Sequence, residues 1–464
     1  LVLLLLGYSA VRWHALWHYG FLPVVSWNND ILSYAYLARS LGEAGLSSPG
    51  WIIGLDAGAA ARGDVLGAYA LLGSGSLVTG DYMTATLPLM WAVNLSATLS
   101  CFAAMLVLTS RRVVISGTAA LLINIVGVSA YQTFQYFLAE KIALALALWL
   151  LAILIRRPSW WQIALASAVV VSALVLAYPQ FVPILLMVAL GASVIPSVKR
   201  GFRDSVVTLA ASLAGAALGL ASVGAYLFER IDRARALQGV VAGWSMPTPN
   251  LVDGIGLRSD LGSVVARGLA SQAMLVLMVV VAGVLLADRR ERPRIAYAIV
   301  FVIPVIVFVR FALAEPDSYR QWKAFAIAAP FLIMIVGVLL AEGADLAGRR
   351  WRGSHAMLAA ITVVVCVVWI GVAARNAWEP TGSISNCDWP DCPIDEKVRV
   401  RYEELARRAG PGPVGVALDP SWSGMTAAYY LWGRPVSMRS WSYWPVTDVP
   451  VTRVLTRDGW IAVG

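Results

Sequence analysis

A single carboxylate, Asp30, stands in a polar and aromatic stretch directly after the first long apolar segment of the chain. Trp27 and Asn29 precede it, and Tyr34 follows it. A carboxylate beside a lipid-embedded helix can take a proton from a hydroxyl group within hydrogen-bond reach, which is general-base chemistry. The alternative is that Asp30 caps a helix beginning near Ile31, and a cap is compatible with a base.

Further charged and aromatic side chains stand where other long apolar segments begin or end. Charged groups at membrane depth are costly, so they point to function. Glu140 and Lys141 open one apolar segment, and Lys323 opens another. The other members of this set are Tyr178, Gln180, Arg310, Glu315, Tyr319 and Arg320. The cations among them are suited to stabilising the negative charge that builds on a phosphate leaving group.

Each of these residues also has a purely structural alternative. Glu140 and Lys141 can pair with other interface charges or extend toward the lipid headgroups. Arg320 and Lys323 can contact headgroups or help set the topology. Trp27 can belong to the belt of aromatic residues that lines a membrane interface. The pattern alone leaves these alternatives open.

The composition indicates the kind of protein that must position these side chains. Of 464 residues, 59% are hydrophobic and 14% are charged, whereas a soluble domain carries about 25% charged residues. The apolar residues fall in runs that predict about eleven transmembrane helices of about 20 residues each. The predicted spans are 1–22, 86–108, 113–130, 138–155, 160–177, 181–197, 205–227, 270–287, 295–313, 323–342 and 355–374. Because the chain begins at Leu1 without a methionine, we expect that the true N-terminus is missing and that the first span is truncated.

Lysine and arginine clusters follow alternate spans, so all of them fall on one side of the membrane. The clusters lie at 111–112, 156–157, 199–203, 289–294 and 349–352. By the positive-inside rule this side is cytoplasmic, which places the loop 23–85 and the tail 375–464 outside. The clusters also account for the net charge of +9. No contiguous basic face with interleaved aromatics is present, so nucleic acid is not an expected partner.

The tail, residues 375–464, differs from the rest in its charged residues, prolines and mixed periodicity, which predict a small extracytoplasmic α/β domain. Expected helices cover 396–408 and 426–432, and expected strands cover 414–418, 451–455 and 460–463. Cys387 and Cys392 favour a disulfide in an oxidising compartment, with two free thiols as the alternative. No metal site is predicted, because a zinc site needs about four ligands and no second Cys/His pair lies nearby.

The layout resembles the GT-C class of membrane glycosyltransferases. The stretch Trp27-Asn28-Asn29-Asp30 with Tyr34 is similar to the start of their large first exterior loop, which holds an essential aspartate. The stretch from Tyr319 to Lys323 is similar to a Tyr-x-x-x-Lys pattern in several bacterial envelope members. The resemblance implies an all-α polytopic membrane bundle over 1–374 and an exterior domain over 375–464.

The same resemblance implies a reaction. A sugar would pass with inversion from a polyprenyl-phosphate donor to a glycan or lipid-linked acceptor at the outer face of the plasma (inner) membrane. Asp30 would act as the base, and aromatic residues of the tail could bind a growing glycan. Many members carry a second acidic residue, whereas here Asn28 and Asn29 precede Asp30. The use of a divalent cation therefore stays open.

Two other functions remain possible from the sequence. A transporter or flippase for a lipid-linked saccharide would carry ionisable groups and broken helices near the midplane. Pro183 and Pro304 fit such breaks, but the charges gather at span ends and no internal repeat is clear. The second alternative is a non-catalytic envelope-assembly subunit of the same architecture.

Overall fold

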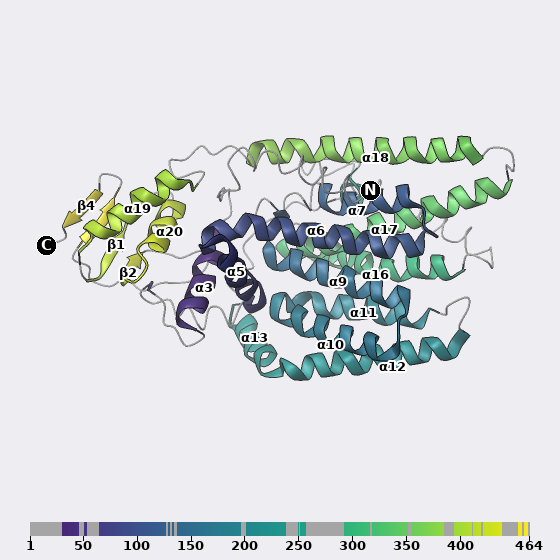
Figure 1. Cartoon of the computed structure of the whole chain (residues 1–464), viewed down its shortest axis with the longest axis horizontal. Helices are drawn as coiled ribbons and strands as arrows, with labels where there is room; N and C mark the ends of the chain where they lie inside the picture. The colour runs from purple at the N-terminus through teal and green to yellow at the C-terminus, as the bar shows by residue number, and fades with distance from the viewer. Residues whose placement is uncertain are drawn as a thin grey trace.

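The structure of the chain is a computed structural model. It describes residues 30–45, 51–52, 65–126, 129, 132–133, 137–195, 201–237, 249, 251–256, 292–315, 318–350, 355–384, 394–410, 412–418, 421–438, 453–456 and 459–462. Long helices run side by side, and shorter helices and a small sheet gather at one end of them (Figure 1).

The long helices form the predicted membrane bundle. They are α6 (Tyr82–Leu108), α7 (Val113–Ile125), α9 (Leu138–Arg156), α10 (Trp160–Ala177), α11 (Val182–Val194), α12 (Gly201–Ser222), α16 (Arg292–Ala314), α17 (Tyr319–Arg350) and α18 (His355–Ile384). Seven described helices are long and apolar enough to cross a membrane, and α7 and α11 are shorter apolar helices. The chain is therefore a multi-pass membrane protein.

Every predicted span except 1–22 and 270–287 coincides with a described helix, and these two lie outside the described residues. One boundary is corrected. The span predicted over 205–227 is broken, because α12 ends at Ser222 and α13 (Gly224–Leu237) follows a turn at Val223. Helix α18 continues to Ile384, and the division of the chain after residue 374 stays a prediction.

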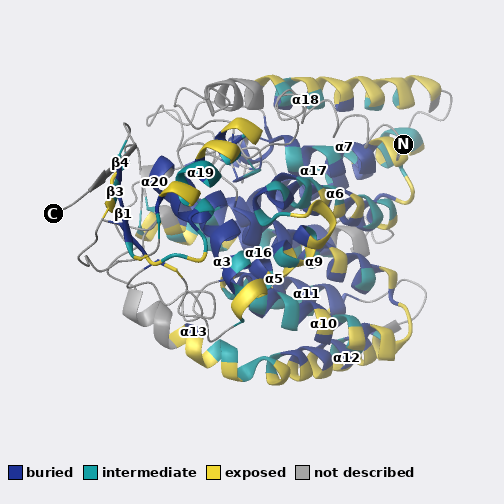
Figure 2. Ribbon diagram, turned by 60° about the vertical axis from the view of Figure 1, so that its left-hand side comes forward, coloured by how far each residue is buried: buried dark blue, intermediate teal, exposed yellow. Residues whose placement is uncertain are grey.

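Helices α9 and α17 lie at the centre of the bundle. In each, 83% of the most apolar stretch is buried, against 17% in α18. Figure 2 shows α18 at the edge of the molecule, exposed along much of its length. An apolar helix that is buried packs against protein on all sides, whereas the apolar side chains of α18 are suited to contact lipid. Side chains at the starts of α9 and α17 are therefore held by protein.

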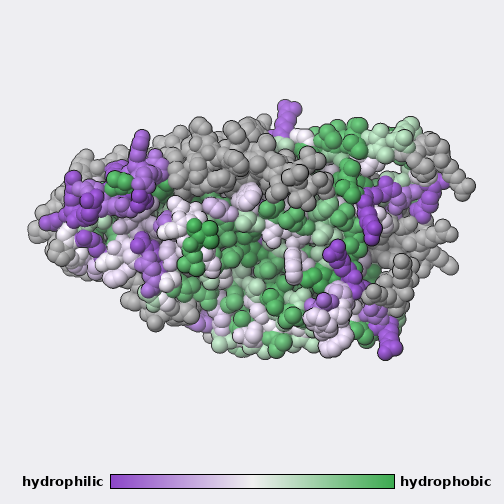
Figure 3. Space-filling model, in the orientation of Figure 1, coloured by the Kyte–Doolittle hydropathy of each residue, from purple (hydrophilic) through white to green (hydrophobic). Residues whose placement is uncertain are grey.

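The two ends of the bundle are hydrophilic, and hydrophobic side chains cover the middle (Figure 3). At one end Arg112, which follows α6, donates to Asp345 of α17. At the same end of the alternating helices, Arg157 donates to Asp204 over 2.9 Å. These arginines belong to the basic clusters, so their placement agrees with the predicted alternation of spans. That this end is cytoplasmic stays a prediction.

The C-terminal part of the chain forms a small α/β unit. It contains α19 (Glu396–Arg408), β1 (Val414–Val416), α20 (Ser421–Tyr430), β2 (Val436–Met438), β3 (Arg453–Thr456) and β4 (Gly459–Ala462). The strand order is β2-β1-β3-β4, with β1 parallel to β2 and β3, and β4 antiparallel to β3. Helix α19 has its predicted bounds, whereas the helix predicted over 426–432 begins earlier, at Ser421. Cys387 and Cys392 lie outside the described residues.

Two helices of the first predicted exterior loop lie at the same end of the bundle as this sheet (Figure 1). They are α3 (Asp30–Ala44) and α5 (Leu66–Thr79). Ile52 of the loop forms a parallel bridge with Val436, which extends the sheet beyond β2. The Arg39 guanidinium of α3 lies 4.5 Å from the ring centroid of Trp432. The loop and the C-terminal unit therefore form one packed structure.

The hydroxyl of Tyr429 links the C-terminal unit to the bundle. It donates to Asp81 Oδ1 over 2.6 Å, and Asp81 Oδ2 caps α6 by accepting from the backbone N–H of Thr84 over 3.0 Å. Burial, then the negative charge of Asp81, raise the pKa of Tyr429 well above its ordinary value. The folded protein therefore favours the neutral phenol.

Replacing Tyr429 with phenylalanine removes this hydrogen bond. The free energy of unfolding should fall by about 1.5–3 kcal/mol, because the acceptor is a carboxylate. The raised pKa also predicts a pH dependence. The stabilisation is complete below the ordinary tyrosine pKa of about 10 and is lost as the pH rises through the higher pKa of the folded state. Melting curves in one detergent should show wild type losing more stability than Tyr429→Phe above about pH 10. Equal losses in wild type and Tyr429→Phe would contradict this reasoning.

Candidate functional site

A cluster of polar side chains lies where α9 begins. Glu140 is 5% exposed and accepts from three groups. The Lys323 ammonium lies 3.0 Å from Glu140 Oε1, the Tyr178 hydroxyl donates to the same oxygen over 3.2 Å, and Gln132 Nε2 donates to Oε2 over 2.7 Å. The carboxylate is thus fixed by one cation and two neutral donors from other segments.

Two lysines in the cluster differ in their access to solvent. Lys141 is 1% exposed, and its ammonium donates to the hydroxyl of Ser129. The Lys323 side chain is 23% exposed, and its ammonium also lies 5.1 Å from the ring centroid of Tyr178. The Glu140 carboxylate pairs with Lys323, whereas Lys141 bonds a neutral hydroxyl. Lys323 is the member that an incoming anion can contact.

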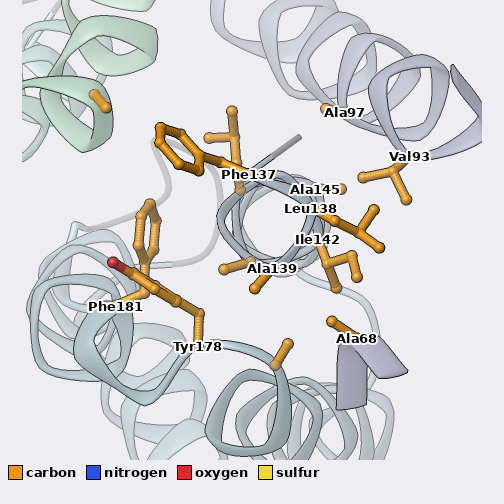
Figure 4. Packing of buried hydrophobic residues seen from close by; sticks show 14 of the residues in the cluster. Ala68, Val93, Ala97, Phe137, Leu138, Ala139, Ile142, Ala145, Tyr178 and Phe181 are labelled. Carbon is orange, nitrogen blue, oxygen red and sulfur yellow. The ribbon is translucent and has the colours of Figure 1, made fainter. Parts of the chain in front are cut away.

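Packing of apolar rings holds these groups in place. Figure 4 looks along α9 and shows Phe137 on the same side of that helix as Tyr178 and Phe181. The Tyr178 and Phe181 rings meet edge to face with centroids 6.0 Å apart. Phe137 packs in the same way on Trp322, the neighbour of Lys323, at 5.7 Å. The rings fix the starts of α9 and α17 relative to each other.

Helix α3 joins this cluster through Tyr34. The backbone N–H of Ala139 donates to the Tyr34 hydroxyl over 3.4 Å, and Ala139 directly precedes Glu140. Asp30 is the first residue of α3 and is half-buried. Residues four apart lie on one face of a helix, with Cβ atoms about 5–6 Å apart. Asp30 therefore lies one turn from the contact between α3 and the start of α9.

Some of the predicted site residues lie together at the start of α9, and others are exposed or pair elsewhere. The structure brings together Tyr34, Glu140, Lys141, Tyr178 and Lys323. That the others belong to the same site stays a prediction. Gln180 and Arg310 are exposed, and Arg320 is 57% exposed and pairs with Glu315 at 3.5 Å.

The remaining predicted residues are not described. Trp27 and Asn29 lie outside the described residues, as does the side chain of Tyr319. The sequence pattern missed Ser129 and Gln132, which supply partners to Lys141 and Glu140. Gln132 belongs to a short polar stretch between two predicted spans, which was the available signal, whereas Ser129 lies near the end of the span predicted over 113–130.

The cluster is suited to binding an anion and lacks the donor set of a metal centre. Among the described ranges, no group of three or more His, Cys, Asp or Glu side chains gathers in one place. A partly exposed ammonium held by a carboxylate and an aromatic ring is oriented before a ligand arrives. Such a group stabilises negative charge without reorganising during a reaction.

Removing the Glu140 carboxylate should destabilise the protein strongly. Glu140→Ala leaves Lys323 without its counter-charge and leaves the donors of Gln132 and Tyr178 unsatisfied. We expect a loss near the lower end of the about 3–5 kcal/mol that breaking a buried pair costs, because Lys323 is partly exposed. A thermal melt would show a large fall in melting temperature. Glu404→Ala, which removes an exposed helix pair, is the control, and an equal fall there would contradict this reasoning.

Comparison with solved structures shows which fold positions the cluster. The chain superimposes on the arabinofuranosyltransferase AftD from Mycobacteria with a TM-score of 0.51 and 16% identity, covering 90% of this chain and 30% of that one. The chain also superimposes on ArnT from Cupriavidus metallidurans in the apo state, with a TM-score of 0.51 and 13% identity, covering 94% of this chain and 85% of that one. The chain has the GT-C fold.

The archaeal oligosaccharyltransferase AglB from Archaeoglobus fulgidus, solved with an inhibitory peptide and a dolichol-phosphate, also shares the GT-C fold. Its TM-score is 0.50 at 9% identity, covering 89% of this chain and 61% of that one. The chain thus spans about three fifths of AglB and less than a third of AftD. No protein-family model and no curated protein matches the chain. At these identities the likeness establishes the GT-C fold, and the reaction must be argued from the site.

Proposed function

We propose that the protein is an inverting glycosyltransferase that moves a sugar from a polyprenyl-phosphate donor to a glycan or lipid-linked acceptor at the outer face of the membrane. The observation that carries the proposal is the cluster of Lys323, Glu140 and Tyr178, beside the helix that begins at Asp30. The GT-C fold supports glycosyl transfer, since AftD and AglB are named as glycosyl-transferring enzymes and AglB was solved with a dolichol-phosphate.

In this proposal Lys323 binds the phosphate of the donor. The bond between the sugar carbon C1 and the phosphate oxygen breaks, and its electron pair goes to the phosphate. The ammonium of Lys323 stabilises that charge, as a preorganised cation does for a leaving group. Glu140 and Tyr178 hold the ammonium in place. Phosphate departs without a proton, so no general acid is required.

Asp30 acts on the acceptor. Its carboxylate takes the proton from the acceptor hydroxyl as the oxygen forms its bond to C1 from the face opposite the phosphate. One carboxylate suffices, unlike in glycoside hydrolysis, where two carboxyl groups flank the bond. The contact of Tyr34 with Ala139 supports this role, because it holds the Asp30 turn of α3 beside the lysine cluster.

A transfer assay tests the proposal. The purified protein in lipid nanodiscs would be given radiolabelled polyprenyl-phosphate pentoses and hexoses with envelope glycan acceptors. We expect label to pass to an acceptor with inverted stereochemistry at C1. Retention of configuration, or no transfer from any donor, would contradict the proposal. Movement of lipid-linked saccharide across liposomes without transfer would favour the flippase instead.

A further inference from the structure

Trp51 lies where the exterior loop meets the C-terminal unit, and its side chain is 37% exposed. Its backbone is held on both sides. The N–H groups of Trp51 and Ile52 donate to the Tyr36 hydroxyl over 2.9 and 3.1 Å. The N–H of Val436 donates to the carbonyl of Trp51 over 2.7 Å. A large ring is thus presented to solvent from a fixed backbone.

Polar and aromatic groups surround this ring. Trp51 and Trp432 meet edge to face with centroids 6.4 Å apart. The Arg39 guanidinium lies over Trp432, and Arg39 Nε donates to Glu43 Oε1 over 2.8 Å. The side chains of Arg39 and Glu43 are 24% and 42% exposed. We name these four residues, Trp51, Trp432, Arg39 and Glu43, the aromatic ledge.

The chemistry of the aromatic ledge fits a carbohydrate. The flat face of an indole ring matches the apolar C–H face of a sugar, and rigid aromatic side chains contact a ligand at low entropic cost. An adjacent arginine and carboxylate can donate to and accept from neighbouring hydroxyl groups in charge-assisted hydrogen bonds. An apolar protein partner would need a wider apolar surface without a charged pair at its centre.

Among the described residues of the C-terminal unit, the tyrosines mostly build its core. Tyr402 and Tyr429 are buried, and Tyr402 stacks on Tyr430 with centroids 6.2 Å apart. Tyr402 and Tyr429 therefore lie in the core rather than on a glycan-binding surface, and Tyr430 is half-buried. The side chain of Trp422 and residues 441 and 444 lie outside what the structure describes. Trp51, which belongs to the exterior loop, instead presents an exposed aromatic ring.

We infer that the aromatic ledge binds the acceptor glycan at a distance from the reacting hydroxyl. The inference rests on the proposed function, because it assigns a subsite to the same reaction. Arg39 follows Asp30 by nine residues in α3, which is about 14 Å along a helix at 1.5 Å per residue. A single sugar ring is too short to contact both. The aromatic ledge therefore favours longer acceptors over short ones.

Glycan binding without turnover tests this inference. The full chain in nanodiscs would be applied to an array of linear arabinan, galactan and mannan disaccharides and octasaccharides. We expect binding to octasaccharides of at least one class, reduced about tenfold by Trp51→Ala, as loss of one aromatic contact implies. Trp51→Phe should retain most of the binding, and Trp160→Ala, an exposed tryptophan at the start of α10, should bind as wild type.

Kinetics separate this inference from the proposed function. With transfer active, Trp51→Ala should raise KM for the octasaccharide about tenfold and leave kcat and the disaccharide KM unchanged. Asp30→Asn should lower kcat about 10²–10⁴-fold and leave array binding intact. Failure of the proposed reaction and failure of the glycan subsite can therefore be told apart. Absence of array binding by wild type, or equal binding by wild type and Trp51→Ala, would overturn the assignment of the aromatic ledge.

Discussion

Asp30→Asn should lower kcat about 10²–10⁴-fold, the usual contribution of a positioned general base. Asparagine cannot accept the acceptor proton, but it caps helices about as well as aspartate. The substitution therefore removes the proposed base and preserves any capping role at the start of α3. Initial-rate measurements with saturating donor and acceptor would give the effect on kcat.

Thermal melting provides the control for Asp30→Asn. The melting temperature should stay near that of wild type, because asparagine keeps the shape of aspartate and loses only its charge at the first turn of α3, worth about 0.3–1 kcal/mol. If transfer stayed within about threefold of wild type, well below the effect of a lost base, Asp30 would not be the base. If the rate and the melting temperature fell together, unfolding of the protein would explain the loss.

Lys323→Gln should lower kcat/KM for the donor about 10²–10³-fold, as removal of one preorganised charge-stabilising group does. The donor loses its phosphate contact, and the leaving phosphate loses a counter-charge. We expect KM for the donor to rise, kcat to fall, and KM for the acceptor to change little. Measuring both Michaelis constants on one preparation would show this asymmetry.

Arg320→Gln is the matched comparison for Lys323→Gln. Arg320 lies one helical turn earlier, is 57% exposed and pairs with Glu315. Its removal should therefore affect donor kinetics much less. Lys323→Arg should restore part of the activity, because the charge remains. Equal losses in Arg320→Gln and Lys323→Gln would mean that a diffuse positive surface, rather than the held ammonium of Lys323, binds the donor.

The sequence predicts how deep a charged residue lies in the membrane better than it predicts which side of its helix the residue faces. Glu140, Arg310 and Lys323 all stand at span ends, and hydropathy places them there correctly. Which of them face one another is not encoded in that pattern, because a buried helix such as α9 is apolar on all sides and shows no preferred face. The Glu140–Lys323 pair depends on the packing of α9 and α17, which are distant in sequence.

The C-terminal unit shows the same limit. Helix α19 was predictable because Val398 and Tyr402 lie on one face of an otherwise charged segment. Strand β2 was not, because it has only three residues and Ser437 interrupts its apolar run. The bridge of Ile52 to β2 was hidden for a different reason. It joins two segments that are distant in sequence, and neither sequence indicates which segment it pairs with. The contact between the loop and the tail could therefore not be predicted.

The most direct test is a cryo-EM structure of the protein in nanodiscs with a polyprenyl phosphate such as undecaprenyl phosphate. The proposal predicts a phosphate oxygen within about 3 Å of Lys323 Nζ, the length of a charge-assisted hydrogen bond. The side of the phosphate that would carry the sugar should face Asp30. A lipid phosphate bound elsewhere, with Lys323 contacting only Glu140 and Tyr178, would contradict the proposed reaction.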